Sequence, residues 1–253
     1  MKLIIQIPCY NEEKTLPITF NDLPKKLDNI DEIDYVIIND GSTDNTVEVA
    51  KKLGIKHIIN IKKNQGLANA FKCGLKYAIE QNADIIVNTD ADNQYCGADI
   101  EKLIKPIING EADIVIGVRP INYIEHFSYL KKKLQQLGSW FVRIISKTNV
   151  IDATSGFRAY SRNAALQINI YTDFTYTLET IILAAKKKLI IKNVPISVNK
   201  KLRESRLFKS NFQYILKSVK TIIRLTLLYE PLKIYFFLGT ILIFFGSIIS
   251  FRF

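Results

Sequence analysis

The 253-residue chain is long enough to bury one sizeable core, and its apolar content of 48% suits a globular domain with an additional apolar segment. Its formal charge of +11 is local, because residues 186–224 hold 12 Lys and Arg against one acid, whereas residues 1–185 hold 21 basic and 22 acidic residues. This basic stretch adjoins the most apolar part of the chain. It therefore resembles the flank of a membrane segment more than a nucleic-acid-binding surface.

Short apolar runs alternate with amphipathic segments through the first half of the chain. The expected strands are Leu3–Ile7, Tyr35–Ile38, His57–Ile61, Asp84–Val87 and Asp113–Val118. The expected helices between them are Glu13–Leu27, Thr46–Leu53, Leu67–Ile79 and Ala98–Asn109. This alternation predicts an α/β fold with a mostly parallel sheet and helices on both of its faces.

Polar residues follow each expected strand. They lie at residues 8–12, 39–42, 64–66, 90–92 and 117–119. In open α/β sheets, ligands bind outside the carboxyl ends of the strands. The sequence therefore predicts one binding site at this edge of the sheet.

The stretch NTDADNQY, residues 88–95, carries the most specific chemistry. Asp90 and Asp92 can both point into one pocket, and Gln94 adds a neutral oxygen. A few hard oxygen ligands suit Mg²⁺ or Mn²⁺ held jointly with substrate phosphates, and no His or Cys cluster competes for a softer metal. Because the chain has neither GxxxxGK[ST] nor GxGxxG, this pattern favours a nucleotide or phosphorylated metabolite without a P-loop or dinucleotide fingerprint. Asp40 could bind a base or ribose, or cap the turn before the helix at 46–53.

The pattern becomes less regular after Pro120. We expect a helix at Tyr129–Lys147, a polar turn at Asp152–Arg162, a helix at Phe174–Ala185, a strand at Leu189–Val194 and a basic loop at Asn199–Arg206. We divide the chain at this break into residues 1–120 and 121–206, which together form one domain.

Two membrane-related segments are expected after residue 206. Residues 207–230 place apolar side chains on one helical face and cations on the other, which is typical of an interfacial helix, although packing on the domain is the alternative. Residues 231–253 include the uncharged run Ile234–Phe251, whose 18 residues would span roughly 27 Å as a helix. We interpret this run as a transmembrane helix, and its position near the C-terminus as a truncated membrane region.

The charge pattern then predicts where the domains lie. The positive-inside rule puts the Lys-rich side of the span, and the catalytic domain with it, in the cytosol, at the plasma membrane or an endoplasmic-reticulum equivalent. The N-terminal apolar run is too short for a signal peptide. Three cysteines without CxxC spacing fit a reduced compartment.

The motifs occur in the order found in a known family. PCYNEE, IINDGSTDNT, NQGLANAFKCG, NTDADNQY, GVR, DATSGFRAYSR, FTYTLE and VPISVNKKLRESRLFKS together resemble family 2 glycosyltransferases with the GT-A fold. The pattern is most similar to the dolichyl-phosphate mannose synthase group and its polyprenyl-phosphate relatives, over about residues 1–225. The resemblance implies inverting transfer of a hexose from a GDP- or UDP-sugar to a dolichyl, undecaprenyl or other polyprenyl phosphate, with membrane lipids as further partners. It leaves the sugar, the isoprenoid length and the oligomeric state open.

The resemblance implies that residues 1–206 are a catalytic domain, with a donor half at 1–120 and an acceptor half at 121–206. It also implies roles for individual residues. The donor nucleotide would be held by Pro8, Tyr10, Glu12, Asp40, Asp90, Ala91, Asp92, Gln94 and Arg119. The metal would be held by Asp92 and Gln94 with Asp90 beside them. The acceptor would meet Lys132, Lys133 and Ser139, on a helix that faces the membrane in the family.

The basic loop departs from the family's R-x-x-G-E-S-K pattern, because Lys200 replaces Arg, Arg203 replaces Gly and Arg206 replaces Lys. Charge survives, but the loop loses a flexible residue and bidentate phosphate geometry at position 200. The candidate catalytic residues are Asp92, Arg119, Asp152, Lys200, Arg203 and Arg206.

The acceptor decides the mechanism. A phosphate acceptor is already ionised, so the cations need only offset the repulsion between acceptor and donor phosphates. A sugar or other hydroxyl acceptor would instead need a carboxylate base, for which Asp152 and Glu179 are candidates. A third reading is a domain that binds nucleotide sugars without catalysis.

Overall fold

The computed structural model describes residues 1–123, 129–171, 175–200, 202, 219–221, 223–224, 227–228 and 231–250. The chain divides into two units, Met1–Leu207 and Phe208–Phe253.

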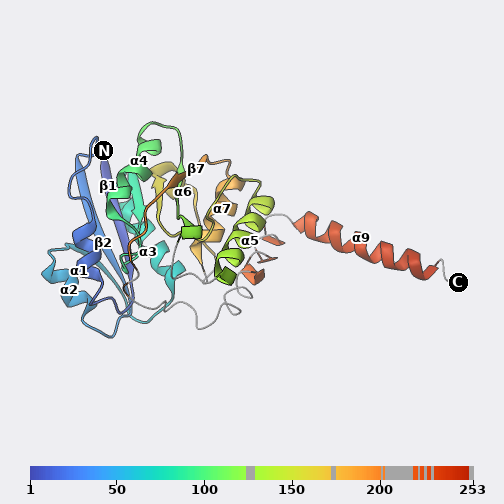
Figure 1. The fold of residues 1–253 in the computed structure, drawn as a ribbon, viewed down its shortest axis with the longest axis horizontal. Coiled ribbons are helices and arrows are strands. Elements are labelled where there is room, and N and C mark those ends of the chain that lie inside the picture. Colours follow the sequence, from blue (N-terminus) through green and yellow to red (C-terminus); the bar gives the residue numbers. More distant parts are fainter. Residues whose placement is uncertain are drawn as a thin grey trace. The chain divides into compact units, whose positions relative to one another are not determined.

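Within the described residues, one seven-stranded sheet organises the Met1–Leu207 unit (Figure 1). Its strands are β1 (Lys2–Cys9), β2 (Glu32–Asp40), β3 (His57–Ile61), β4 (Ile85–Asn88), β5 (Ile114–Val118), β6 (Arg158–Ser161) and β7 (Ile191–Pro195). The strand order is β3-β2-β1-β4-β6-β5-β7, and every pairing is parallel except the two that β6 makes. The predicted α/β fold with a mostly parallel sheet is confirmed.

The helices of this unit are α1 (Leu16–Asp22), α2 (Thr46–Lys52), α3 (Leu67–Glu80), α4 (Ile100–Ile108), α5 (Tyr129–Ser146), α6 (Arg162–Gln167) and α7 (Tyr176–Lys186), with 3₁₀ turns η1 (Gly97–Asp99) and η2 (Ile121–Tyr123). Successive side chains of a strand point to opposite faces of the sheet. Leu3 and Ile5 of β1 share a buried cluster with Leu103 of α4, whereas Gln6 meets Gly74 of α3. Helices therefore cover both faces, as predicted.

Two elements differ from the expectation, and both differences have local causes. Helix α1 is shorter than Glu13–Leu27 because a turn closed by Glu12 precedes it and Pro24 follows it. The residue before a proline favours extended backbone, which Leu23 adopts. Strand β6 was not predicted, since its four residues directly follow a polar turn and give too short a pattern.

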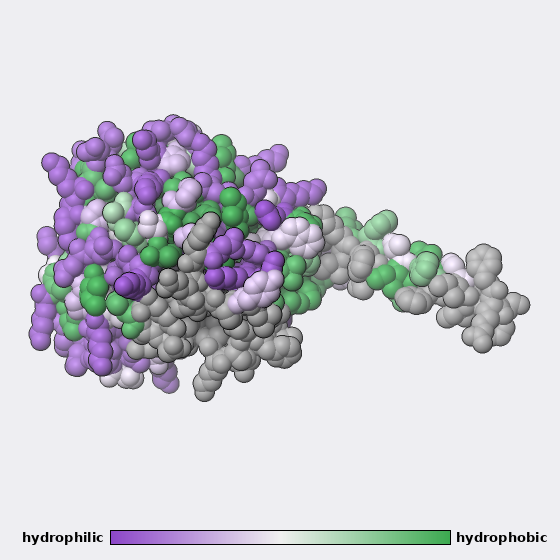
Figure 2. All heavy atoms as spheres, viewed as in Figure 1, coloured by the Kyte–Doolittle hydropathy of each residue, from purple (hydrophilic) through white to green (hydrophobic). Residues whose placement is uncertain are grey.

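The second unit contains helix α9 (Pro231–Ser250). Much of the expected interfacial helix at 207–230 lies outside the described residues, but 219–221, 223–224 and 227–228 are helical. Hydrophobic side chains are visible along α9, whereas the visible face of the first unit is largely hydrophilic (Figure 2). Over the residues that the structure describes, no helix meets the length and hydropathy of a membrane span. The membrane-spanning role of 234–251 stays a prediction.

Candidate active site

Five strands bring polar side chains to one edge of the sheet, which we call the strand-end rim: the segments directly after β1, β2, β4 and β5 and directly before β6. The register aligns Cys9 with Asn39 and Asn88 with both Gln6 and Arg158. Because β6 is antiparallel, the turn before it returns to the same edge as the ends of its neighbours. The sheet topology therefore agrees with the prediction that distant segments converge on one edge.

Two carboxylates of the rim fix the backbone of neighbouring loops. Asp40 accepts hydrogen bonds from the amides of Gln65 and Gly66, both at 2.8 Å, so it joins the end of β2 to the loop before α3. Glu12 accepts from the Thr15 hydroxyl at 2.5 Å. Both carboxylates are almost completely buried. The turn before α2 is instead bound by Asp44, which accepts from the Thr46 amide at 3.0 Å.

The loop after β4 brings its polar side chains together. The side-chain amide of Gln94 donates to Asp92 at 2.6 Å. The backbone carbonyl of Ala91 accepts from the Thr19 hydroxyl at 2.9 Å, which attaches the loop to α1. A Cβ atom on Gly156 would lie 3.4 Å from each carboxylate oxygen of Asp90, so the turn before β6 packs closely against that acid. Asp90, Asp92 and Gln94 thus lie on one short, anchored loop.

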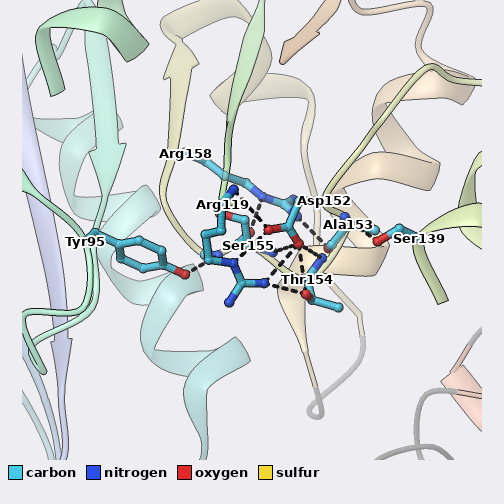
Figure 3. Close-up of polar contacts among 9 residues, drawn as sticks. Tyr95, Arg119, Ser139, Asp152, Ala153, Thr154, Ser155 and Arg158 are labelled. Atoms are coloured by element: carbon cyan, nitrogen blue, oxygen red, sulfur yellow. Dashed lines mark hydrogen bonds and ion pairs between the residues drawn. The ribbon is translucent and has the colours of Figure 1, made fainter. Parts of the chain in front are cut away.

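An ion pair joins the end of β5 to the turn before β6 (Figure 3). Arg119 binds Asp152 through two nitrogens, with Nε to Oδ2 at 2.7 Å and Nη2 to Oδ1 at 2.9 Å. Asp152 is fully buried and also accepts from the amides of Thr154 and Ser155. Burial alone would raise the pKa of Asp152, but the Arg119 charge and the hydrogen bonds from Arg119 and the Thr154 hydroxyl outweigh it, and the pKa lies below its ordinary value.

Comparison with known proteins decides the family. The family model "Glycosyl transferase family 2" matches residues 4–168. The chain belongs to glycosyltransferase family 2. A UDP-N-acetylglucosamine–dolichyl-phosphate N-acetylglucosaminyltransferase of Methanococcus voltae is 36% identical over 75% of this chain and 82% of its own length. A dolichol-phosphate mannosyltransferase of Pyrococcus furiosus is 30% identical over 85% of this chain and 62% of its own length.

The fold comparison agrees with this membership. A glucosyl-3-phosphoglycerate synthase from Mycobacterium tuberculosis, solved with Mn²⁺, UDP and phosphoglyceric acid, superposes with a TM-score of 0.68 at 16% identity and covers 89% of this chain and 77% of the solved chain. At that identity the likeness concerns the GT-A-like fold alone. The protein is thus a glycosyltransferase related to polyprenyl-phosphate sugar transferases.

The remaining residues that were predicted to bind the donor lie at the start of the rim. Pro8 is in β1, where it aligns with Ile38 of β2, and Tyr10 directly follows the strand with a half-exposed side chain. Asn11, between Tyr10 and Glu12, has a positive φ of 57° and accepts from the Thr43 amide. The loops after β1 and β2 therefore hold each other in place.

The basic loop begins beside the acidic one. Tyr95 pairs with Val198 in an isolated antiparallel bridge, and the Asn199 amide donates to the Gln94 carbonyl at 2.9 Å. Lys200 follows directly and is exposed. Arg203 and Arg206 lie outside the described residues. Lys200, the first cation of the predicted loop, is therefore the residue next to Asn199, whose amide binds Gln94.

The expected acceptor residues all lie on α5, in different environments. The ammonium of Lys132 donates to the Asn122 carbonyl at 2.8 Å, and that of Lys133 lies 5.6 Å from the Tyr129 ring centroid. Ser139 is buried and accepts from the Ala153 amide at 3.1 Å, so in this conformation it supports the turn before β6. Glu179 of α7 is also buried and accepts from the Tyr171 amide at 2.8 Å.

The sequence analysis assigned no role to a buried polar chain beneath the rim. The side chain of Gln6 donates to Asn88 at 2.8 Å, and Asn88 donates to the Tyr176 hydroxyl at 2.8 Å and the Gly156 carbonyl at 3.0 Å. The Gly156 amide donates to the Tyr95 hydroxyl at 3.0 Å. A polar residue inside an apolar strand, as Gln6 is in LIIQI, was the signal that could have located this chain.

The loop after β4 has the chemistry for a divalent cation. Asp90, Asp92 and Gln94 supply carboxylate and amide oxygens and no soft ligand, which fits Mg²⁺ or Mn²⁺ shared with phosphates. Over the described part of the chain there is no group of three or more His, Cys, Asp or Glu residues suited to a metal.

Proposed function

We propose that this protein transfers a hexose from a nucleotide sugar to a polyprenyl phosphate at the cytosolic face of a membrane, with inversion at the anomeric carbon. The observation that carries the proposal is the state of the two candidate bases. Asp152 is ion-paired with Arg119 and has a lowered pKa, and Glu179 is buried and bound to a backbone amide. An ion-paired carboxylate with a lowered pKa, as Asp152 is, is a poor proton acceptor, and the Glu179 carboxylate is engaged with a backbone amide. A phosphate acceptor needs no base.

The reaction is then a displacement without proton transfer. An acceptor phosphate oxygen forms the new bond to the anomeric carbon, while the bond from that carbon to the donor diphosphate breaks and its electron pair leaves with the nucleoside diphosphate. When bound, Mg²⁺ or Mn²⁺ would neutralise charge on that leaving group, held by Asp92 and Gln94 with Asp90 nearby. Arg119 and Lys200 would offset the repulsion between the two phosphorylated reactants.

The nucleotide half of the donor would lie along the first strands. Pro8, Tyr10 and Ala91 would contact it directly, and Glu12 and Asp40 would contact it or hold the loops that do. Lys132, Lys133, Arg203 and Arg206 would meet the acceptor phosphate. Two relatives are named for sugar transfer to dolichyl phosphate, one with UDP-N-acetylglucosamine and one with mannose in its name. They support this class of acceptor and leave the donor to experiment.

Membrane attachment belongs to the same proposal. A polyprenyl phosphate is confined to the bilayer, so its transferase must work at that surface. Large apolar side chains of α9, including Phe236, Leu242 and Ile243, are exposed in the structure. We propose that residues 231–253 anchor the protein and that 207–230 lie in the interface.

The test uses the full chain, purified in detergent, with Mg²⁺ or Mn²⁺, a polyprenyl phosphate and a panel of radioactive UDP- and GDP-sugars. We expect label from one donor to enter an acid-labile lipid fraction. Label in a soluble glycan or a protein would contradict the proposal and favour a hydroxyl acceptor. Metal-dependent nucleotide binding without donor consumption would favour a non-catalytic domain.

A further inference from the structure

Arg158, at the start of β6, is one of the largest fully buried side chains of the protein. Its guanidinium donates to the carbonyls of Ser155 at 2.8 Å and Ala153 at 2.9 Å. It also donates to α7, to the Thr177 carbonyl at 2.8 Å and the Thr180 hydroxyl at 2.6 Å. All four acceptors are neutral oxygens. A buried charge matched only by neutral acceptors is expensive, which calls for an explanation beyond packing.

Two of these acceptors belong to residues 152–155, which we call the 152–155 turn. Asp152 of this turn binds Arg119, and the Ala153 amide donates to Ser139. Both arginines therefore contact the 152–155 turn (Figure 3). Arg119 binds the carboxylate of the turn, and Arg158 binds its backbone carbonyls. The position of the Arg119 guanidinium depends on Asp152, and the position of Asp152 depends on a turn whose carbonyls are bound by Arg158.

The next residue extends this dependence to the acidic loop. Gly156 follows the turn, donates to the Tyr95 hydroxyl, and lies so close to Asp90 that an added Cβ would contact both carboxylate oxygens. Its carbonyl accepts from Tyr176 at 3.1 Å, at the start of the same helix that Arg158 binds. A shift of the turn would therefore reach both the cation at the end of β5 and the acids after β4.

We propose that Arg158 is a positioning residue for sugar transfer, which holds the 152–155 turn so that Asp152 aims the Arg119 guanidinium at the donor phosphates. This inference rests on the proposed function for the role of Arg119. Lysine at position 158 would keep the charge but lose the planar fork that reaches four acceptors in different directions. A merely structural arginine would affect unfolding but would not act on transfer through Arg119.

The chain offers a matched control. Arg162 lies at the opposite end of β6 and donates to the carbonyls of Ile79 at 3.2 Å and Ala83 at 3.3 Å. It is an arginine bound to backbone oxygens, like Arg158, but it contacts neither the 152–155 turn nor Arg119 through any of these bonds. Arg162→Lys should leave transfer close to the wild-type value.

The first measurement is a double-mutant cycle on kcat/KM, with the donor that the label-transfer assay selects. Because misplacement by about 1 Å can cost 100-fold, we expect Arg158→Lys to lower kcat/KM by about that factor. In an Arg119→Lys background the guanidinium to be positioned is already gone. There, Arg158→Lys should lower kcat/KM further by less than about threefold. Losses that multiply would overturn the proposal, and so would wild-type transfer by a folded Arg158→Lys protein.

The second measurement needs no catalysis and so separates this inference from the proposed function. In arginine-labelled full-length protein, the Nε–H signal of Arg119, assigned by its loss in Arg119→Lys, should exchange slowly because it is bound to Asp152. Arg158→Lys should accelerate that exchange by about tenfold or more, and Arg162→Lys should not. Unchanged exchange in Arg158→Lys would overturn the inference even if wild-type protein transferred no sugar.

A milder variant covers the case in which Arg158→Lys does not fold. Thr180→Val keeps the shape of the side chain and removes the one hydroxyl acceptor of Arg158. We expect it to accelerate Arg119 Nε–H exchange in the same direction by a smaller factor. A folded Thr180→Val protein with wild-type exchange would then decide against the proposal.

Discussion

The β3-β2-β1-β4 half of the sheet and the β6-β5-β7 half treat their rim carboxylates differently. In the first half, Asp40 accepts hydrogen bonds from two backbone amides, which are neutral donors. In the second half, Asp152 binds a guanidinium through both oxygens. A carboxylate bound only by neutral groups keeps its formal charge, whereas one paired with arginine contributes little net field at a distance.

The rim therefore carries acidic and basic groups at different places. Asp90 and Asp92 follow β4, at the acidic side of the site, and Lys200 follows the segment that pairs with Gln94 and Tyr95. Arg119 directly follows β5, which is two strands from β4 in the sheet order. In a donor diphosphate with a bound divalent cation, the cation would contact the aspartates. The diphosphate oxygens would contact the cationic side chains. The arrangement suits a ligand that presents both signs of charge.

The largest effect is expected on the acidic side. Asp92→Ala should lower transfer by roughly a thousandfold, because Lewis-acid stabilisation of the leaving diphosphate is worth several kcal/mol. The fold should be little affected, since Asp92 lies in a loop and not in a strand or helix. Transfer can be measured with radioactive donor, and folding by circular dichroism.

The matched control is Asp28→Ala, at an exposed aspartate before β2, which should leave both measurements unchanged. Turnover of Asp92→Ala near that of the wild type would remove the metal role from this loop. It would also remove the functional difference between the two halves of the rim.

The rim itself could be predicted because it depends on local pattern and a general rule of α/β sheets. Apolar runs give the strands, and polar residues after each run mark their carboxyl ends. The partners of those polar residues could not be predicted in the same way. That Asp40 binds the amides of Gln65 and Gly66 follows from the pairing of β2 with β3, which joins residues far apart in sequence.

Arg158 shows the same limit more sharply. In the sequence GFRAYSR it is an ordinary cation at the start of a short segment, and cations are usually exposed. Its burial depends on α7 packing over β6 and on the turn folding back beneath it. Helix α1 was predicted too long because the apolar periodicity of the sequence continues past Pro24. The backbone of Leu23 is already extended there.

The next effect concerns the ion pair of the second half. Asp152→Asn keeps the shape of the side chain but removes the carboxylate charge that the mostly buried Arg119 binds. Breaking a buried pair from one side costs about 3 kcal/mol, or roughly 6–12 °C in Tm for a domain of this size. Thermal unfolding of the full chain in detergent measures it. An unchanged Tm would contradict the expected cost of breaking this ion pair.

The same ion pair predicts a pH dependence. The pKa of Asp152 is lowered in the folded protein, so its stabilising contribution is complete above the unfolded value of about 3.9 and is lost as pH falls through the folded value. The Tm difference between wild type and Asp152→Asn should therefore be constant from about pH 8 to 5 and shrink only below about pH 4. A difference that shrinks between pH 7 and 5 would contradict the lowered pKa.

The smallest effect tests the contact between the two halves. A Cβ on Gly156 would lie 2.8 Å from the Tyr176 hydroxyl and 3.4 Å from each Asp90 oxygen, so Gly156→Ala should destabilise by about 1–3 kcal/mol. Gly138 of α5 has open space at the same position, and Gly138→Ala should stabilise by about 0.5–1 kcal/mol through its helix propensity. Paired Tm measurements should therefore move in opposite directions. If Gly156→Ala also stabilised, the turn before β6 could move away from Asp90 at no cost, and the two halves would not be coupled through this contact.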